Sequence, residues 1–179
     1  GGGYRFLSPK NLEAVAFLKQ LYDDACAWLP RPSEEKAAAF AARGALFAAG
    51  GLEELSEFGR ALAAAENPDE WTVLTFPGPD QPGLVTYGSS FVVFKGSPEQ
   101  QLASWLFIRW MLSAENQQKW VEATGLFPLR SSMVVQLASY SRSHPQWATA
   151  VQLVPRGQIQ PQLASWRVVR VMLGDGFDA

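Results

Sequence analysis

The sequence predicts an α/β fold in which short apolar strands alternate with amphipathic helices. Three runs of aromatic, β-branched or small apolar residues lie close to glycine or proline, as strands do: 45–48, 71–76 and 91–94. The segments around these runs carry apolar residues at helical spacing and begin with serine or proline signals. With 179 residues, 47% of them apolar, the chain is long enough to build a hydrophobic core.

The first third of the chain is predicted to contain three helices. Ser8 and Pro9 open a helix that runs to about Ala27, because serine suits the N-cap and proline the first helical position. An alanine-rich helix begins at residues 33–35, and a further helix covers residues 52–65.

The densest proline and glycine segment is residues 77–83, which cannot be helical and suits an exposed turn or a crossing between domains. After it, Ser97, Pro98 and Gln100 form a capping-box start. The helix from Pro98 to about residue 112 is apolar around most of its circumference, so we expect it to be buried on more than one side.

The remaining elements are helical. Ser113 begins a helix that ends at Gly125, a typical C-terminal glycine. Short helices are predicted at residues 133–137 and from Pro145 onward, and a last one at residues 163–173.

Composition argues against several function classes. The net charge of −2 gives no basic surface for nucleic acid. The single cysteine, Cys26, excludes a disulfide framework and a cysteine-based zinc site, and the single histidine, His144, leaves no histidine cluster. No phosphate-binding glycine motif is present, so we expect no metal and no cofactor.

An enzyme is not predicted either. Adjacent carboxylates such as Glu53 and Glu54 diverge by about 100° on a helix and cannot share one substrate, so we interpret them as solvated faces. No serine has a convincing base partner. A hydrolase would need catalytic residues from outside this chain.

Several motifs, in order, carry a family resemblance. Tyr-Gly-Ser-Ser precedes the 91–94 run, Ser-Pro-Glu-Gln opens an aromatic helix, and Ser-Ala-Glu-Asn-Gln and Gly-Leu-Phe-Pro-Leu-Arg follow. This order resembles the extracellular solute-binding proteins of ABC importers, family 1, in the sugar-binding branch that includes maltose-binding protein. The resemblance covers about residues 8–174.

The resemblance implies a type II-like periplasmic-binding-protein fold of two α/β lobes, of which this chain would be a C-terminal half fragment. Residues 1–76 would belong to the C-terminal lobe, 83–125 to the N-terminal lobe and 126–179 to the C-terminal lobe. Hinge crossings would lie near 77–83 and 125–128. The protein would be extracellular or periplasmic, with its signal or lipid anchor in a missing N-terminal region.

Ligand-binding candidates follow from chemistry and from the resemblance together. Tyr87, Gly88 and Ser89 offer a stacking ring, backbone access and a hydroxyl, although an ordinary strand entry is the alternative. Gly50 and Gly51 would present backbone N–H groups at a cleft, or form a plain turn.

Two further candidates are Trp166 and Arg130. The resemblance implies that Trp166 stacks on a sugar ring, and a core position is its alternative. Arg130 could reach a ligand near the cleft, or could simply fix the hinge from the surface. Residues 52–54 replace the aromatic residues of maltose-binding protein, which leaves the sugar identity open.

The resemblance therefore implies non-catalytic capture of a small solute, a carbohydrate, for delivery to an ABC permease. A structural or protein-binding α/β module without a small ligand is the alternative. For a fragment, we also expect dimerisation or exchange of residues 83–125 through the uncovered apolar helix, and weak or absent ligand binding.

Overall fold

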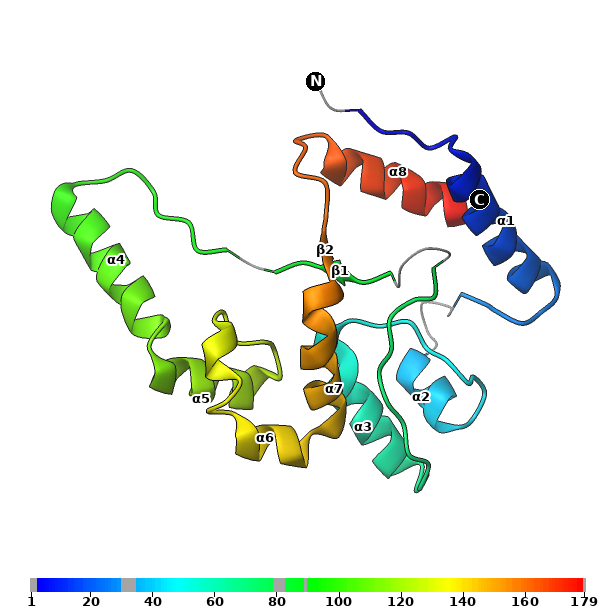
Figure 1. Cartoon of the computed structure of the whole chain (residues 1–179), viewed down its shortest axis with the longest axis horizontal. Coiled ribbons are helices and arrows are strands. Elements are labelled where there is room, and N and C mark those ends of the chain that lie inside the picture. The colour runs from blue at the N-terminus through cyan, green and yellow to red at the C-terminus, as the bar shows by residue number, and fades with distance from the viewer. Residues whose placement is uncertain (1–2, 30–34, 79–82, 89, 179) are drawn as a thin grey trace. The chain divides into compact units, whose positions relative to one another are not determined.

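The computed structural model describes residues 3–29, 35–78, 83–88 and 90–178, with the side chains of 177 and 178 excepted. The chain divides into two compact units (Figure 1). Unit 1 comprises residues 1–36 and 161–179, and unit 2 comprises residues 37–160. The described residues are mostly helical, and none of their helices has both the length and the hydrophobicity needed to cross a membrane.

Unit 1 contains the long helices α1, Pro9–Asp23, and α8, Trp166–Asp178. The predicted start of α1 is confirmed, since the Ser8 hydroxyl accepts from the Asn11 backbone N–H. Its end comes earlier than predicted, because Ala25 takes a left-handed conformation and the next backbone N–H groups turn back to Leu21.

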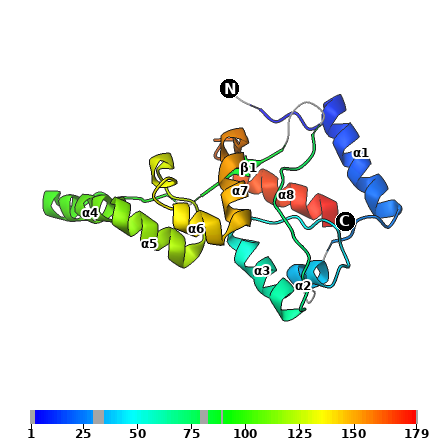
Figure 2. The same cartoon turned by 60° about the horizontal axis from the view of Figure 1, so that its bottom comes forward.

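Unit 2 contains the remaining helices and both strands. Figure 2 shows α4 continuing into α5, followed by α6 and α7 in chain order. The elements are α2 Lys36–Ala41, η1 Leu52–Glu54, α3 Leu55–Ala64, β1 Val85–Thr86, α4 Pro98–Met111, α5 Ala114–Thr124, η2 Ser131–Met133, α6 Ala138–Ser143, α7 Pro145–Leu153, η3 Val154–Arg156 and β2 Gln158–Ile159.

The predicted strands at 45–48, 71–76 and 91–94 are wrong. The described part of the chain has only β1 and β2, which pair in parallel through Val85–Gln158 and Thr86–Ile159. Phe76 makes an isolated antiparallel bridge to Gly83. An extended run becomes a strand only when a neighbour accepts its backbone hydrogen bonds, and these three runs have no such ladder among the described residues. The expected α/β fold therefore appears here as a mainly helical structure.

The core of unit 2 gathers around three buried side chains, Val121, Leu137 and Trp147, which come from α5, the turn before α6, and α7. Partly buried hydrophobic side chains pack against them: Leu52, Phe127, Tyr140 and Val151. A second apolar group joins the rings of Phe40, Phe58 and Trp71. These two groups hold η1 and α3 in a packed part of the unit.

Helix α4 confirms its predicted start but not its predicted burial. Gln100 N–H donates to the Ser97 hydroxyl, Ser97 N–H donates to the Gln100 side chain, and Pro98 opens the helix. None of its residues is buried. Between 51% and 57% of each large apolar residue is exposed at positions 102, 105, 106, 107 and 110. In the described residues no element covers this helix on two sides, so it is not buried; its exposure agrees with the expectation of an uncovered apolar helix.

One polar side chain fixes the exit from α5. Gln117 is 99% buried; its Nε2 donates to the Met111 carbonyl at 3.0 Å, and its Oε1 accepts from the Leu129 N–H at 2.9 Å. Gly125 ends α5, as predicted, and it does so in the left-handed conformation with φ of +70°. The segment after α5 is thereby tied to the end of α4.

Candidate functional site

The candidate site in unit 2 forms where the turn at Gly51 meets the residue that follows β1. The Tyr87 hydroxyl donates to Glu53 Oε1 at 2.8 Å, across 34 positions of sequence. Two of the predicted ligand-binding segments are therefore brought together by a contact that involves Glu53, a residue outside the predicted set.

The glycines at this turn make room for carboxylates. Gly51 N–H donates to Glu54 Oε2 at 2.7 Å, which closes the first turn of η1. A Cβ at Gly51 would collide with the Glu53 carboxylate, and one at Gly50 would press on Glu54 and Phe58. A side chain at either position would push these carboxylates away from their present places.

The two carboxylates have separate partners. Glu53 binds Tyr87 and Glu54 binds the Gly51 backbone, so they diverge as adjacent helical residues should. Glu53 is exposed, as expected for a solvated face, and Glu54 is partly buried; each also holds a specific hydrogen bond. Glu54 could have been found from its place three residues after Gly51, whereas no local pattern links Glu53 to Tyr87.

The remaining predicted residues of unit 2 are less constrained. Gly88 is exposed, and a Cβ there would meet open space, so the fold does not require glycine at this position. Ser89 lies outside the described residues. Arg130 is exposed and precedes η2 in an extended conformation. Among the described residues its side chain has no hydrogen bond or ion pair, so the structure does not join it to Tyr87 or Gly51.

Trp166 belongs to unit 1, where it is the first residue of α8 and is partly exposed. Its ring stacks on Tyr4 with the centroids 5.8 Å apart and the planes 28° apart. The alternative of a buried core tryptophan is not what the structure shows. Tyr4 was not among the predicted residues.

The segment that carries Tyr87 is attached to β2 through Thr86, the last residue of β1. The Thr86 hydroxyl donates to the Gln158 carbonyl at 3.2 Å, and Gln158 N–H donates to the Leu84 carbonyl at 2.8 Å. A Cβ at Gly157 would overlap the Thr86 side chain, so this close approach needs glycine. The position of Tyr87 is thus set by the residue that precedes it.

The site carries negative charge from Glu53 and Glu54. The hydrogen bond to Glu53 raises the pKa of Tyr87 because it favours the protonated phenol; partial burial and the charges of Glu53 and Glu54 act in the same direction. A carboxylate and a phenol can together accept and donate hydrogen bonds to a hydroxylated solute, and the negative charge disfavours an anion.

We expect Glu53→Gln to lower the pKa of Tyr87, because the substitution removes the charge and keeps the shape. The folded-state pKa is raised, so the Tyr87–Glu53 contact stabilises the fold below the usual phenol pKa of about 10 and is lost as pH rises through the raised value. Ultraviolet titration, taken as the difference from Tyr87→Phe, measures this. Glu57→Gln on the same helix is the control, and an unchanged Tyr87 titration in Glu53→Gln would contradict the contact.

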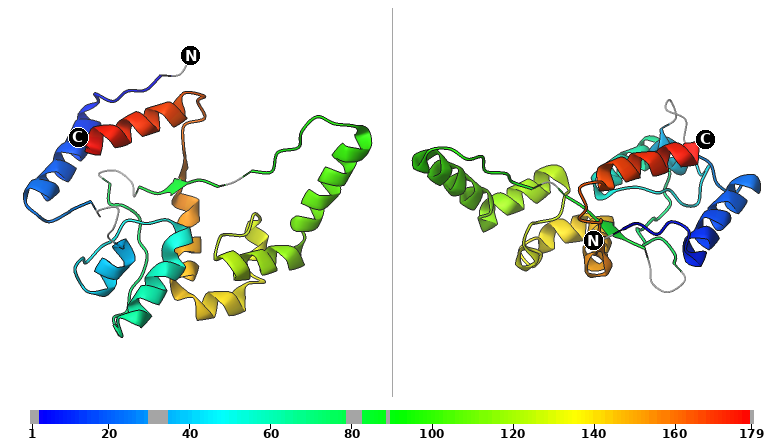
Figure 3. Two further views of the ribbon diagram at one scale, coloured as in Figure 1. Left: turned by 180° about the vertical axis from the view of Figure 1, so that it is seen from behind. Right: turned by 90° about the horizontal axis from the view of Figure 1, so that it is seen from above.

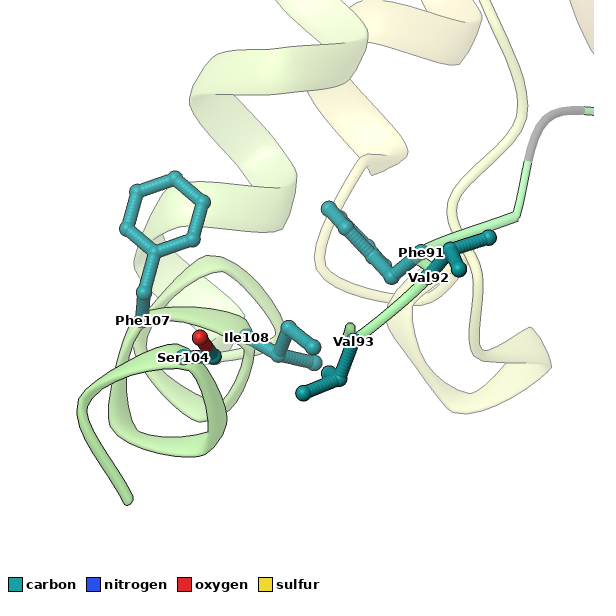
Figure 4. Close-up of a pocket in the computed structure, with 6 residues that line it drawn as sticks. All are labelled: Phe91, Val92, Val93, Ser104, Phe107 and Ile108. Carbon is teal, nitrogen blue, oxygen red and sulfur yellow. The ribbon is translucent and has the colours of Figure 1, made fainter. Parts of the chain in front are cut away.

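An open pocket lies elsewhere in the described part of unit 2. It has a volume of about 330 Å³ and is lined by the 91–93 segment and by Ser104, Phe107 and Ile108 of α4. Figure 4 shows Ile108 turned toward Val93 across it. Ser104 is its single polar side chain, and that hydroxyl already donates to the Gln100 carbonyl. This pocket therefore lacks the converging polar groups that a sugar needs.

A protein family matches most of the chain. Residues 6–153 match the family described as bacterial extracellular solute-binding protein. No curated protein matches the chain significantly. The family match covers the Gly51 turn, Tyr87 and Arg130, and it ends before Trp166.

Proposed function

Because the chain belongs to the bacterial extracellular solute-binding proteins, we propose that it captures a small hydroxylated solute, a sugar, for the permease of an ABC importer. Members of this family bind solutes outside the cytoplasm for transport, and they are in general not catalysts. The chain is accordingly an extracellular or periplasmic solute-binding chain. Sugar as the solute, the ABC permease as the partner and attachment through a lipid anchor are parts of the proposal.

The observation that carries the proposal is the 2.8 Å hydrogen bond from Tyr87 to Glu53. It places a phenol, a carboxylate and the Gly50–Gly51 turn at one exposed place. Sugar hydroxyls donate well to carboxylates, and a sugar ring can pack its C–H face on a tyrosine. A solute that binds here would exchange the Tyr87–Glu53 hydrogen bond for bonds of its own.

The proposed lobe assignment follows the order of segments. Residues 1–76 and 126–179 would form the C-terminal lobe and residues 83–125 would belong to the N-terminal lobe, with hinges near 77–83 and 125–128. Solute contacts on both lobes would favour a closed state only through their differential affinity for it. Gly50, Gly51, Tyr87, Gly88, Ser89, Trp166 and Arg130 are the proposed contacts.

Titration calorimetry in the natural full-length context tests the proposal. Glucose, galactose, xylose and maltose are the neutral probes, and glucose 6-phosphate and galacturonate are the anionic ones. We expect binding of at least one neutral sugar and a loss of about 10-fold or more in Glu53→Gln, because hydrogen bonds to charged groups contribute about 1.5–3 kcal/mol.

The matched control for this experiment is Glu57→Gln, which removes the same charge from the first turn of α3. It should leave the affinity nearly unchanged. Absence of binding to every sugar, or binding of the anions in preference, would contradict the proposal.

The alternative function is a protein-binding module without a small ligand. The observation that favours it is the exposed apolar face of α4 described above. Light scattering and calorimetry, used together, distinguish the two functions. Association of the chain without any sugar binding supports the protein-binding module, and sugar binding by a monomer supports solute capture.

A further inference from the structure

The segment before α1 lies against the start of α8 in unit 1 (Figure 3). Tyr4 contacts two aromatic rings: its ring stacks on Trp166 at 5.8 Å and on Phe6 at 5.7 Å, with interplanar angles of 28° and 14°. Its hydroxyl is 3.1 Å from the Ser165 hydroxyl, and either can be the donor. One side chain thus contacts two adjacent residues that are more than 160 positions away in sequence.

We infer that Tyr4 is a positioning residue for Trp166, which holds the indole ring in the orientation that stacks on a solute. The inference rests on the proposed function, in which Trp166 is a stacking contact. It assigns a role to a residue that is distant from Trp166 in sequence and that lies outside the proposed ligand contacts.

The geometry explains why two contacts are needed. Ring stacking alone permits the indole to slide in its plane, because offset stacked arrangements lie close in energy. The hydrogen bond between the hydroxyls of Tyr4 and Ser165 ties Tyr4 to the residue before Trp166. Phe6 also stacks on the Tyr4 ring and helps to hold it in place. Trp166 is partly exposed at a helix start, so burial holds it less firmly than it holds a core side chain.

The expected size of the effect follows from the strength of an aromatic pair. If stacking keeps Trp166 in its binding orientation, loss of the Tyr4–Trp166 pair lowers the fraction of molecules in which Trp166 has that orientation. The stacking free energy sets the largest possible decrease, and the apparent affinity falls with this fraction. Stacked pairs support a factor of about 2 to 10. We therefore expect Tyr4→Ala to weaken sugar binding about 2- to 10-fold, and Tyr4→Phe and Ser165→Ala to weaken it about 2-fold each.

The experiment has one readout that needs no ligand. The fluorescence of Trp166 is isolated as the difference between a protein and its Trp166→Phe variant, in the unchanged, Tyr4→Phe, Tyr4→Ala and Ser165→Ala backgrounds. Acrylamide quenching of this difference signal reports how freely the indole moves. We expect stronger quenching in Tyr4→Ala, and intermediate, equal quenching in Tyr4→Phe and Ser165→Ala, since both remove the same hydrogen bond.

The second readout is calorimetry with the four neutral sugars named above. Combining Tyr4→Phe with Ser165→Ala should give no further loss, as for two partners of one bond. Unchanged Trp166 quenching in Tyr4→Ala would overturn the inference, whether or not sugars bind. Altered quenching with no sugar binding by the parent protein would overturn the proposed function and leave the positioning of Trp166 by Tyr4 supported.

Discussion

Replacing Trp147 by alanine should lower the free energy of unfolding by about 3–5 kcal/mol, the range for removal of a large aromatic side chain from a core. Trp147 is 97% buried and packs on Val121 and Leu137. Its ring also meets Tyr140 edge to face at 5.2 Å and Phe127 at 6.0 Å. Alanine would leave a cavity at the centre of the core of unit 2. Urea unfolding followed by circular dichroism measures the change.

Phenylalanine at position 147 distinguishes the contribution of ring packing from that of the polar indole N–H. The Trp147 indole N–H is buried and has no hydrogen-bond partner among the described residues, which is a cost to the native fold. Trp147→Phe removes that donor and keeps an aromatic ring, so its loss should be clearly smaller than that of Trp147→Ala. Trp110→Ala is the control, since Trp110 is 57% exposed, and it should change stability by no more than about 0.5 kcal/mol. Equal losses at 147 and 110 would contradict the core assignment.

Gln117→Leu should cost about 2–4 kcal/mol although leucine is the more hydrophobic residue. The substitution removes the partners of the Met111 carbonyl and the Leu129 N–H in two partly buried hydrogen bonds, and an unsatisfied buried group costs about 1–3 kcal/mol. The measurement is again urea unfolding. Gln118→Leu is the matched control, because the neighbouring Gln118 donates to Glu122 in an exposed hydrogen bond.

A second variant at the same position gives a pH signature. Gln117→Glu keeps an acceptor for Leu129 but buries a carboxyl, and burial raises the pKa of such a group. A raised folded-state pKa means that this variant is most stable below the unfolded glutamate value of about 4.3 and loses stability as pH rises. A loss that does not depend on pH, or a stable Gln117→Leu, would show that this side chain does not bridge the two segments.

The parts of the fold that were predicted correctly depend on local chemistry. Ser97, Pro98 and Gln100 begin α4 as expected, and Gly125 ends α5, because capping groups act within one helical turn. The order of motifs also predicted the family that residues 6–153 match.

The parts that were missed depend on distant partners. The 91–94 run has strand composition, yet a strand needs a neighbour that composition does not supply, and among the described residues it has none. At the site, Gly51 and Tyr87 were predicted, but the contact between their segments is made by Glu53. Tyr4 and Trp166 lie at opposite ends of the chain, so no periodicity could pair them.

The β1–β2 pair has a consequence for the order of folding. Thr86 and Gln158 are 72 positions apart, and closing a loop of that length from an unfolded chain costs roughly 2.5 kcal/mol more in entropy than closing a loop of about four residues. Two residues on each strand return only a few hydrogen bonds at about 0.5–1.5 kcal/mol each. We therefore expect the ladder to form after helices α4 to α7 have brought the two strands near each other, rather than to act as a nucleus. Because Tyr87 directly follows β1, we expect its contact with Glu53 to form late as well.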